Sequence, residues 1–332
     1  MRKLCLTLIA LSVSVAVSAA SPSVKEIDKI RIGGVARWDY LSLDSAQHRL
    51  YVSHSTATEV IDTSTNSLIG TIGDTPGVHG IAIAQSLGVG FVSDGAIDAV
   101  TVFDLASLKT LAKIKVGQNP DAILFDPASR RVMTFNGKSH DVTIIDAEAR
   151  TVVATVPVGG KPEFAQMDTV GHAWFNLDES NEIAVLDPRL GKVIHRTSLT
   201  SCDGPSGLTI DDEQRLYAVC DNKRMVVVSP EGKVLGDAAI GAGADGVAWL
   251  DGAVYSANGD DGTISVVRET TANHFEVVET FGTAVGARTI AADPLTRRLY
   301  LPASSRLQPV GAAKRRIGVD GSFYVLVLEK QH

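Results

Sequence analysis

Apolar and polar residues alternate in short runs along most of the chain, and the alternation recurs about every 42 residues. Gly, Pro, Asp and Asn bound four such runs in each repeat, and no segment beyond residue 20 keeps a helical period over several turns. Four strands in about 42 residues predict the blade of a β-propeller. Each repeat carries an apolar–aromatic pair or a close variant of it, at Leu50-Tyr51, Gly90-Phe91, Val132-Met133, Ala173-Trp174, Leu216-Tyr217, Val254-Tyr255 and Leu299-Tyr300.

The repeats predict an all-β fold with seven four-stranded antiparallel blades, whose first strands begin near residues 39, 79, 121, 163, 206, 245 and 288. The last blade supplies only three strands, near 289–293, 297–302 and 322–329. We expect the alternating stretch 24–32 to add the missing fourth strand. This pairing of the two ends of the chain would close the ring and remove its open sheet edges.

The first 20 residues have the composition of a secretory signal peptide. Arg2 and Lys3 precede an apolar stretch over residues 4–17, and small residues follow it up to Ala20. We therefore expect a mature chain of residues 21–332, folded as a single propeller domain in the periplasm or outside the cell, without a membrane span. In that oxidising compartment the two remaining cysteines, Cys202 and Cys220, predict one disulfide.

Charge and aromatic content exclude some classes of partner. The chain has 31 Lys and Arg against 38 Asp and Glu, a net charge of −7, and loss of Arg2 and Lys3 would make it −9. Nucleic acids and anionic membranes bind basic surfaces, and single-stranded DNA also needs stacking rings, yet only 5% of the residues are aromatic. We expect a monomer that binds a small molecule or a protein rather than nucleic acid.

The repeat itself resembles the YVTN-type β-propeller repeat. It reads G-x-x-P, an apolar strand, D-P-x-x-R-R-hydrophobic-Tyr and V-x-V-hydrophobic-D, and across residues 24–329 the chain is similar to the secreted YncE-like propellers. This resemblance implies the fold but no activity, because such propellers are mostly described only as propellers or as surface or DNA-binding proteins. The matching segments include Arg37-Trp38-Asp39-Tyr40, Pro76-Gly77-Val78-His79-Gly80, Asn119-Pro120-Asp121-Ala122, Gly160-Lys161-Pro162-Glu163-Phe164 and Gly286-Ala287-Arg288-Thr289.

One residue in each blade directly precedes the small or apolar start of the innermost strand. We call these positions the axial ring: Asp39, His79, Asp121, Glu163, Ser206, Asp245 and Arg288. Loops that enter the innermost strands of a propeller surround one mouth of its channel, so we expect these side chains to converge. Carboxylates so close together repel one another unless a cation, a proton or Arg288 intervenes.

The axial ring has several chemical interpretations. Asp39, Asp121, Glu163 and Asp245 could hold a hard cation such as Ca²⁺ through their oxygens. The ring could equally bind an ammonium group or supply an acid and base pair. Alternatively, its acids only cap loop amides and face water in a wide mouth.

Loops between the second and third strands should open on the same mouth. From them we assign further residues to the expected ligand site: Asn136, Lys138, His140, Asp221, Asn222 and Asn258. Trp38 could add an apolar or cation-binding wall, although a packed tryptophan is the alternative, and Asn and Asp are ordinary hairpin residues. Residues 303–321 form a long loop with Arg306, Lys314, Arg315 and Arg316, which we expect to be either a basic flap over the mouth or disordered.

Two functions fit these features. The favoured one is a binding or interaction propeller that acts through its acidic mouth, because no nucleophile elbow, zinc-ligand spacing, haem motif or phosphate-binding glycine loop is present. The alternative is a metal-dependent, lactonase-like hydrolase in which Ca²⁺ held by the ring polarises a carbonyl group. A DNA-binding propeller is a minor alternative that rests on the resemblance alone.

Overall fold

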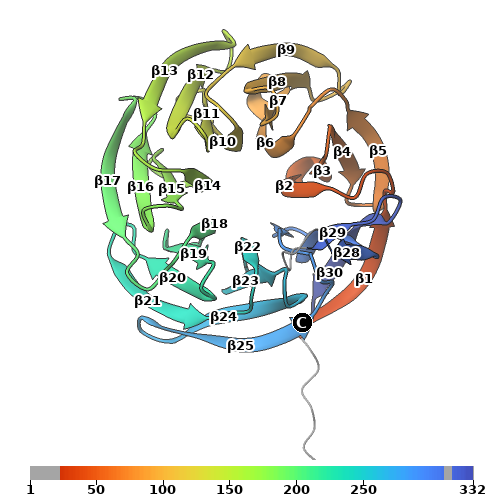
Figure 1. The fold of residues 1–332 in the computed structure, drawn as a ribbon, viewed down its shortest axis with the longest axis vertical. Coiled ribbons are helices and arrows are strands. Elements are labelled where there is room, and N and C mark those ends of the chain that lie inside the picture. Colours follow the sequence, from red (N-terminus) through yellow and green to blue (C-terminus); the bar gives the residue numbers. More distant parts are fainter. Residues whose placement is uncertain (1–22, 310–315, 332) are drawn as a thin grey trace, which may run out of the picture.

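The computed structural model describes residues 23–309 and 316–331, most of which lie in seven four-stranded antiparallel sheets around a central axis (Figure 1). The innermost strands are β2 (Trp38–Asp44), β6 (Val78–Ala84), β10 (Pro120–Asp126), β14 (Pro162–Met167), β18 (Pro205–Ile210), β22 (Ala244–Leu250) and β26 (Ala291–Asp293). The predicted seven-bladed β-propeller is confirmed. The predicted signal peptide, residues 1–20, lies outside the described residues.

The other strands follow in order from the axis to the rim of each blade. The second strands are β3 (Arg49–His54), β7 (Val89–Asp94), β11 (Arg131–Asn136), β15 (Ala173–Leu177), β19 (Leu216–Cys220), β23 (Ala253–Asn258) and β27 (Arg298–Ser304). The third strands are β4 (Ala57–Asp62), β8 (Ala99–Asp104), β12 (Asp141–Asp146), β16 (Glu182–Asp187), β20 (Arg224–Val228), β24 (Thr263–Thr271) and β30 (Phe323–Lys330). The outer strands are β5 (Ser67–Ile72), β9 (Thr110–Lys115), β13 (Thr151–Pro157), β17 (Lys192–Ser198), β21 (Val234–Ala239), β25 (His274–Gly282) and β1 (Val24–Arg31). Single 3-10 turns, η1 (Ser45–Gln47) and η2 (Gln85–Leu87), follow β2 and β6.

The hydrophobic core lies between neighbouring blades. Because each sheet packs against one sheet on either side, both faces of its second and third strands are buried, and these strands are almost continuously apolar. The outer strands are largely exposed, as in Lys192–Ser198. Burial of apolar surface between blades therefore holds successive repeats at a fixed angle around the axis.

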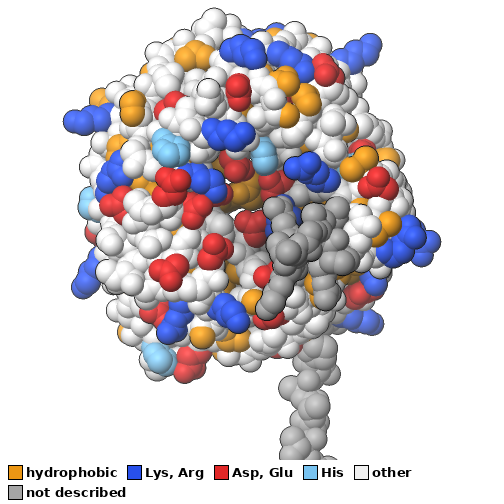
Figure 2. Space-filling model, viewed as in Figure 1, with side chains coloured by type: hydrophobic (Ala, Val, Ile, Leu, Met, Phe, Trp, Pro, Cys, Tyr) orange, Lys and Arg blue, Asp and Glu red, His pale blue; other side chains and the backbone are white. Residues whose placement is uncertain are grey.

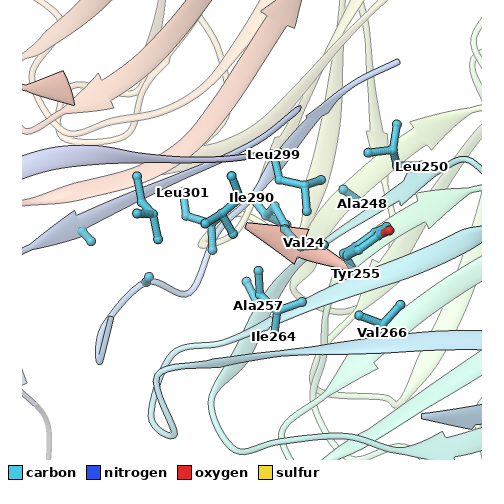
Figure 3. Close-up of a cluster of buried hydrophobic side chains, with 14 of the residues drawn as sticks. Val24, Ala248, Leu250, Tyr255, Ala257, Ile264, Val266, Ile290, Leu299 and Leu301 are labelled. Carbon is cyan, nitrogen blue, oxygen red and sulfur yellow. The ribbon is translucent and has the colours of Figure 1, made fainter. Parts of the chain in front are cut away.

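The two ends of the chain close the ring in blade seven. β1 pairs antiparallel with β30, from Val24 opposite Lys330 to Arg31 opposite Tyr324. Val24 enters a buried cluster with Tyr255 and Leu299 from blades six and seven (Figure 3). Ile30, near the other end of β1, packs into a second cluster that joins blades seven and one. The predicted closure by residues 24–32 is confirmed.

A β-bulge interrupts the innermost strand at the axial-ring position in blades one to six. In β2 the register shifts between Trp38 and Leu41, and the same shift recurs in β6, β10, β14, β18 and β22. A bulge removes residues from the ladder and redirects their side chains. Polar side chains of the second strands satisfy freed backbone groups: Ser53 Oγ accepts the Asp39 amide (2.7 Å), and Ser93 Oγ donates to the Asp121 carbonyl (2.6 Å).

Two further elements lie near the mouth of the channel. Cys202 and Cys220 form the predicted disulfide, which joins the segment before β18 to the end of β19. Between β27 and β30, the short strands β28 (Leu307–Pro309) and β29 (Arg316–Gly318) pair antiparallel. Of the predicted basic flap, Lys314 and Arg315 lie outside the described residues, and Arg306 donates to the carbonyl of Asp320 (3.3 Å). No helix in the described ranges is long and apolar enough to cross a membrane.

The closing strand can be tested with two isoleucines on β1. Ile30 is 6% exposed and Ile27 is 39% exposed. We expect Ile30→Ala to lower the free energy of unfolding by about 2–4 kcal/mol, because it leaves a cavity between blades seven and one, and Ile27→Ala by less than about 1 kcal/mol. Urea unfolding followed by tryptophan fluorescence measures both. Equal losses for the two variants would contradict the observed register of β1.

Candidate functional site

The structure gathers the axial ring at one end of the channel. Contacts link successive blades, from Asp245 through Arg288, Asp39 and His79 to Asp121. Figure 2 shows this face of the molecule, with Asp and Glu side chains around the central opening and Lys, Arg and His side chains on its rim. The sequence prediction that residues more than 200 positions apart meet here is therefore supported by direct contacts, as between Arg288 and Asp39.

Asp39 is the best-compensated carboxylate of the ring. Its Oδ2 lies 2.5 Å from His79 Nδ1, and its Oδ1 accepts from Arg288 Nη2 at 3.2 Å. The carbonyl of Asp39 accepts the Thr289 hydroxyl at 2.6 Å. Burial opposes ionisation of Asp39, but these cations outweigh it and hold the pKa of its carboxyl below the ordinary value.

His79 is a cation at neutral pH. Burial alone would lower its pKa, but the hydrogen bond to Asp39 and the field of Asp121 and Asp39 raise it to about 9. Gly95 makes room for the imidazole, since a Cβ at that position would lie 2.7 Å from His79 Cδ2 and Nε2. With Nδ1 protonated and directed at Asp39, His79 serves as a counterion within the ring.

The remaining carboxyls of the ring are less well compensated. Burial raises the pKa of Asp121 to about 7, because His79 offsets only part of the cost and Asp39 adds repulsion. Asp121 Oδ1 is buried without a hydrogen-bond partner among the described residues and lies 3.7 Å from His79 Nδ1. Burial and then repulsion from Asp121 raise the pKa of Glu163 to about 8 although Lys161 binds it. Burial also raises the pKa of Asp245, despite its 2.7 Å contact with Arg288 Nε.

An aromatic pair lies across the channel next to the ring. Tyr40 and Phe164 directly follow the ring residues of blades one and four, and their rings meet edge to face with centroids 4.8 Å apart. β2 and β14 stand opposite each other across the axis (Figure 1). Tyr40 is 6% exposed, and the ring carboxyls contribute to raising the pKa of its hydroxyl well above the ordinary value, after burial. The pair keeps water from one side of the carboxyls, which explains why burial dominates their pKa shifts.

A cavity of about 440 Å³ opens beside the ring, over blades one to three. It is polar, and its lining includes His79 together with two exposed cations, Arg37 and Lys138. Asp98 also lines it, with Oδ1 accepting the Asn119 amide at 2.9 Å. The predicted site residue Lys138 therefore belongs to this cavity rather than to the carboxyl cluster.

The structure places the other predicted site residues outside the carboxyl cluster. Asn136 and Asn258 are fully buried, and their amides donate to Thr143 and Ser265 inside their blades. Trp38 is packed, with its indole stacked on Phe323, and only its carbonyl meets the site, by accepting from Arg288. The remaining three lie on exposed or partly exposed loops of the mouth: His140, Asp221 and Asn222.

A metal ion would meet a different set of ligands from the predicted one. Asp39, His79 and Asp121 each offer one atom within 4.8 Å of the other two. Of the predicted calcium ligands, Glu163 is bound to Lys161 and Asp245 to Arg288. One imidazole and two carboxylates are a donor set for zinc or manganese rather than for calcium, which prefers oxygen alone.

Two cations that shape the site, Arg37 and Lys161, were not assigned to it from the sequence. Both stand two residues before a ring residue, where the other five repeats have Gly77, Asn119, Gly204, Gly243 and Gly286, all with positive φ. A left-handed turn favours Gly or Asn at that position, so a long cation there departs from the repeat. A cation in place of the turn residue could therefore have identified Arg37 and Lys161 as candidate site residues from the sequence.

Comparisons with known proteins bear on the fold. No protein-family model and no curated protein sequence matches the chain. Among solved structures it is similar to Kuenenia stuttgartiensis hydrazine synthase, with a TM-score of 0.70 and 14% identity, over 80% of this chain and 92% of that one. It is also similar to the RRP9 WD40 repeats, with a TM-score of 0.74 and 8% identity over 92% and 98% of the two chains. A third neighbour, U3-55K, has a TM-score of 0.72 and 8% identity, over 91% and 98%. By fold the protein is a β-propeller.

Asp94, at the end of β7, provides a pH-dependent test of burial near the mouth. It occupies the place of Asn136 and Asn258, is fully buried, and accepts from Thr101, while its Oδ1 has no partner in the described part of the chain. Burial raises its pKa to about 7. The folded state therefore holds a proton that the unfolded state releases near pH 4, so this carboxyl destabilises the fold increasingly as pH rises from about 4 to 7.

We expect Asp94→Asn to stabilise the protein more at about pH 8 than at about pH 5, with a difference approaching 1.4 kcal/mol for each pKa unit crossed. Urea unfolding of both proteins at the two pH values measures the change. Other titrating groups are common to both proteins and cancel in the comparison. A stability difference that did not change with pH would show that Asp94 is ionised in the folded protein.

Proposed function

We propose that the protein is an exported binding module that takes the positively charged group of a small-molecule ligand into its axial ring. The observation that carries the proposal is the incomplete compensation at Asp121 and Glu163. Four ring carboxyls share three cations, His79, Arg288 and Lys161, and Lys161 also binds Asp178 at 2.9 Å. Asp121 Oδ1 is buried without any partner among the described residues. An ammonium or guanidinium group placed between these carboxyls would neutralise them and supply the missing donor.

Export rests on the composition of residues 1–20, and the resemblance to secreted YVTN-type propellers is consistent with it. The disulfide between Cys202 and Cys220 agrees with an oxidising compartment. Propellers commonly act as interaction modules, and the same mouth could receive a cationic side chain of a protein partner.

The test is isothermal titration calorimetry at neutral pH with ethanolamine and agmatine as cationic probes and acetate as the anionic control. We expect both cations to bind and acetate not to bind. Binding should release protons, because Asp121 and Glu163, with pKa values of about 7 and 8, must ionise to receive the cation. The release is measured by repeating the titration in buffers of different ionisation enthalpy. Affinity should therefore rise with pH through this range.

Two variants and a control locate the binding. Asp121→Asn and Glu163→Gln should each weaken cation binding by roughly tenfold or more, as expected for the loss of a charge-assisted hydrogen bond. Asp146→Asn removes a carboxylate at the opposite end of blade three and should leave the affinity unchanged. Failure of both cations to bind, or equal affinity in all three variants, would contradict the proposal.

A second candidate is the metal-dependent hydrolase, which the proximity of Asp39, His79 and Asp121 favours. A divalent ion there would supply a Lewis acid for a bound carbonyl group. It must displace the proton of His79, whose pKa of about 9 opposes it at neutral pH. Titration with zinc and manganese chloride distinguishes the two candidates: metal binding that His79→Gln abolishes would favour the hydrolase, and its absence would eliminate it.

A further inference from the structure

The polar cavity beside the axial ring has a charge opposite to that of the ring. Arg37, Lys138 and His79 all line it. The side chains of Arg37 and Lys138 form no hydrogen bond or ion pair with the described part of the chain, whereas Lys161 of blade four binds both Glu163 and Asp178. The one acid of the lining, Asp98, already accepts the Asn119 amide. Arg37 and Lys138 therefore line a cavity of about 440 Å³, and neither has an ion-pair partner among residues 23–309 and 316–331.

The position of Arg37 in its repeat supports a role outside folding. Five repeats use Gly or Asn with positive φ two residues before the ring, but Arg37 and Lys161 are not among the residues of the described chain with positive φ. In blade four the cation that replaces the turn residue forms an ion pair with a ring residue, Glu163. In blade one the equivalent cation, Arg37, lines the open cavity instead, and its side chain forms no hydrogen bond or ion pair with the described residues.

We propose that this cavity binds the oxyanion, a carboxylate or a phosphate, of a zwitterionic ligand whose cationic group occupies the axial ring; the assignment rests on the proposed function. His79 lies between the two parts, since its Nδ1 contacts Asp39 while its ring lines the cavity. Arg37 and Lys138 supply charge-assisted donors to the oxyanion, and the side-chain amides of Gln118 and Asn119 in the same lining can add neutral ones. Because His79 borders both the axial ring and the cavity, we expect the cationic and anionic groups of the ligand to be joined by a short linker.

The test compares four probes by calorimetry at low ionic strength: ethanolamine, inorganic phosphate, O-phosphoethanolamine and β-alanine. The test variant is the double substitution of two exposed residues, Arg37→Ala with Lys138→Ala. The control is Lys233→Ala, which removes an exposed lysine from the turn between β20 and β21, at the end of blade five away from the mouth. We expect phosphoethanolamine or β-alanine to bind at least about tenfold more tightly than ethanolamine, and the tighter of the two identifies the oxyanion. The paired variant should lose this gain and retain the ethanolamine affinity, and added salt should reduce the gain.

The outcomes separate the two proposals. If ethanolamine binds but neither zwitterion binds more tightly, or if the paired variant keeps the gain, the oxyanion site is wrong and the proposed function stands. If inorganic phosphate binds in a manner that depends on Arg37 and Lys138 while ethanolamine does not bind, the proposed function is wrong and the zwitterion assignment falls with it. An unchanged gain in Lys233→Ala is required in either case, because a loss there would indicate a general charge effect.

Discussion

The pairing of β1 with β30 is the constraint on which the site depends. It joins the first and last strands of the ring, and only in a closed ring can Arg288 of blade seven reach Asp39 of blade one. The guanidinium of Arg288 also donates to the Trp38 carbonyl, and the hydroxyl of Thr289 donates to the Asp39 carbonyl. Closure therefore fixes both the sheets and the charges at the axis. Without it, the ring carboxyls would separate and hydrate.

The same geometry lowers the stability of the fold, because it buries several carboxyl groups close together. Bulges at equivalent places in six innermost strands direct polar side chains to one end of the channel, and Tyr40 with Phe164 excludes water from one side of them. Carboxyls in such a place either pair with a cation or hold a proton. Asp39 pairs with two cations, which lower its pKa, whereas the pKa values of Asp121 and Glu163 are raised to about 7 and about 8, the latter despite its contact with Lys161. These raised values destabilise the fold at the position where a cationic ligand would offset the cost.

Much of this arrangement could be predicted from the sequence, because the repeat fixes equivalent positions. The spacing of Asp39, His79, Asp121 and their counterparts identifies one residue per blade, and seven blades with a shared last sheet bring them to one axis. The repeat says nothing about contacts across the axis, such as that of Tyr40 with Phe164, since those depend on the size of side chains half a ring apart. The repeat also does not show that Asn136 has a structural role, its amide donating to Thr143 inside the blade, whereas Lys138, two residues later, lines the cavity. The sequence distinguishes Arg37 and Lys161 only as departures from the glycine or asparagine that the other five repeats have at this turn.

Carboxyl-carbon NMR titration of the ligand-free protein measures the ionisation of Asp121 and Glu163 directly, with Asp121→Asn and Glu163→Gln used to assign the two resonances. We predict that Asp121 titrates with a pKa of about 7 and Glu163 with a pKa of about 8, and that each pKa shifts when the other residue is replaced. Titration of both at their ordinary values, 3.8 and 4.5, would show that the ring is hydrated and open, and would contradict the claim that closure forces uncompensated carboxyls together.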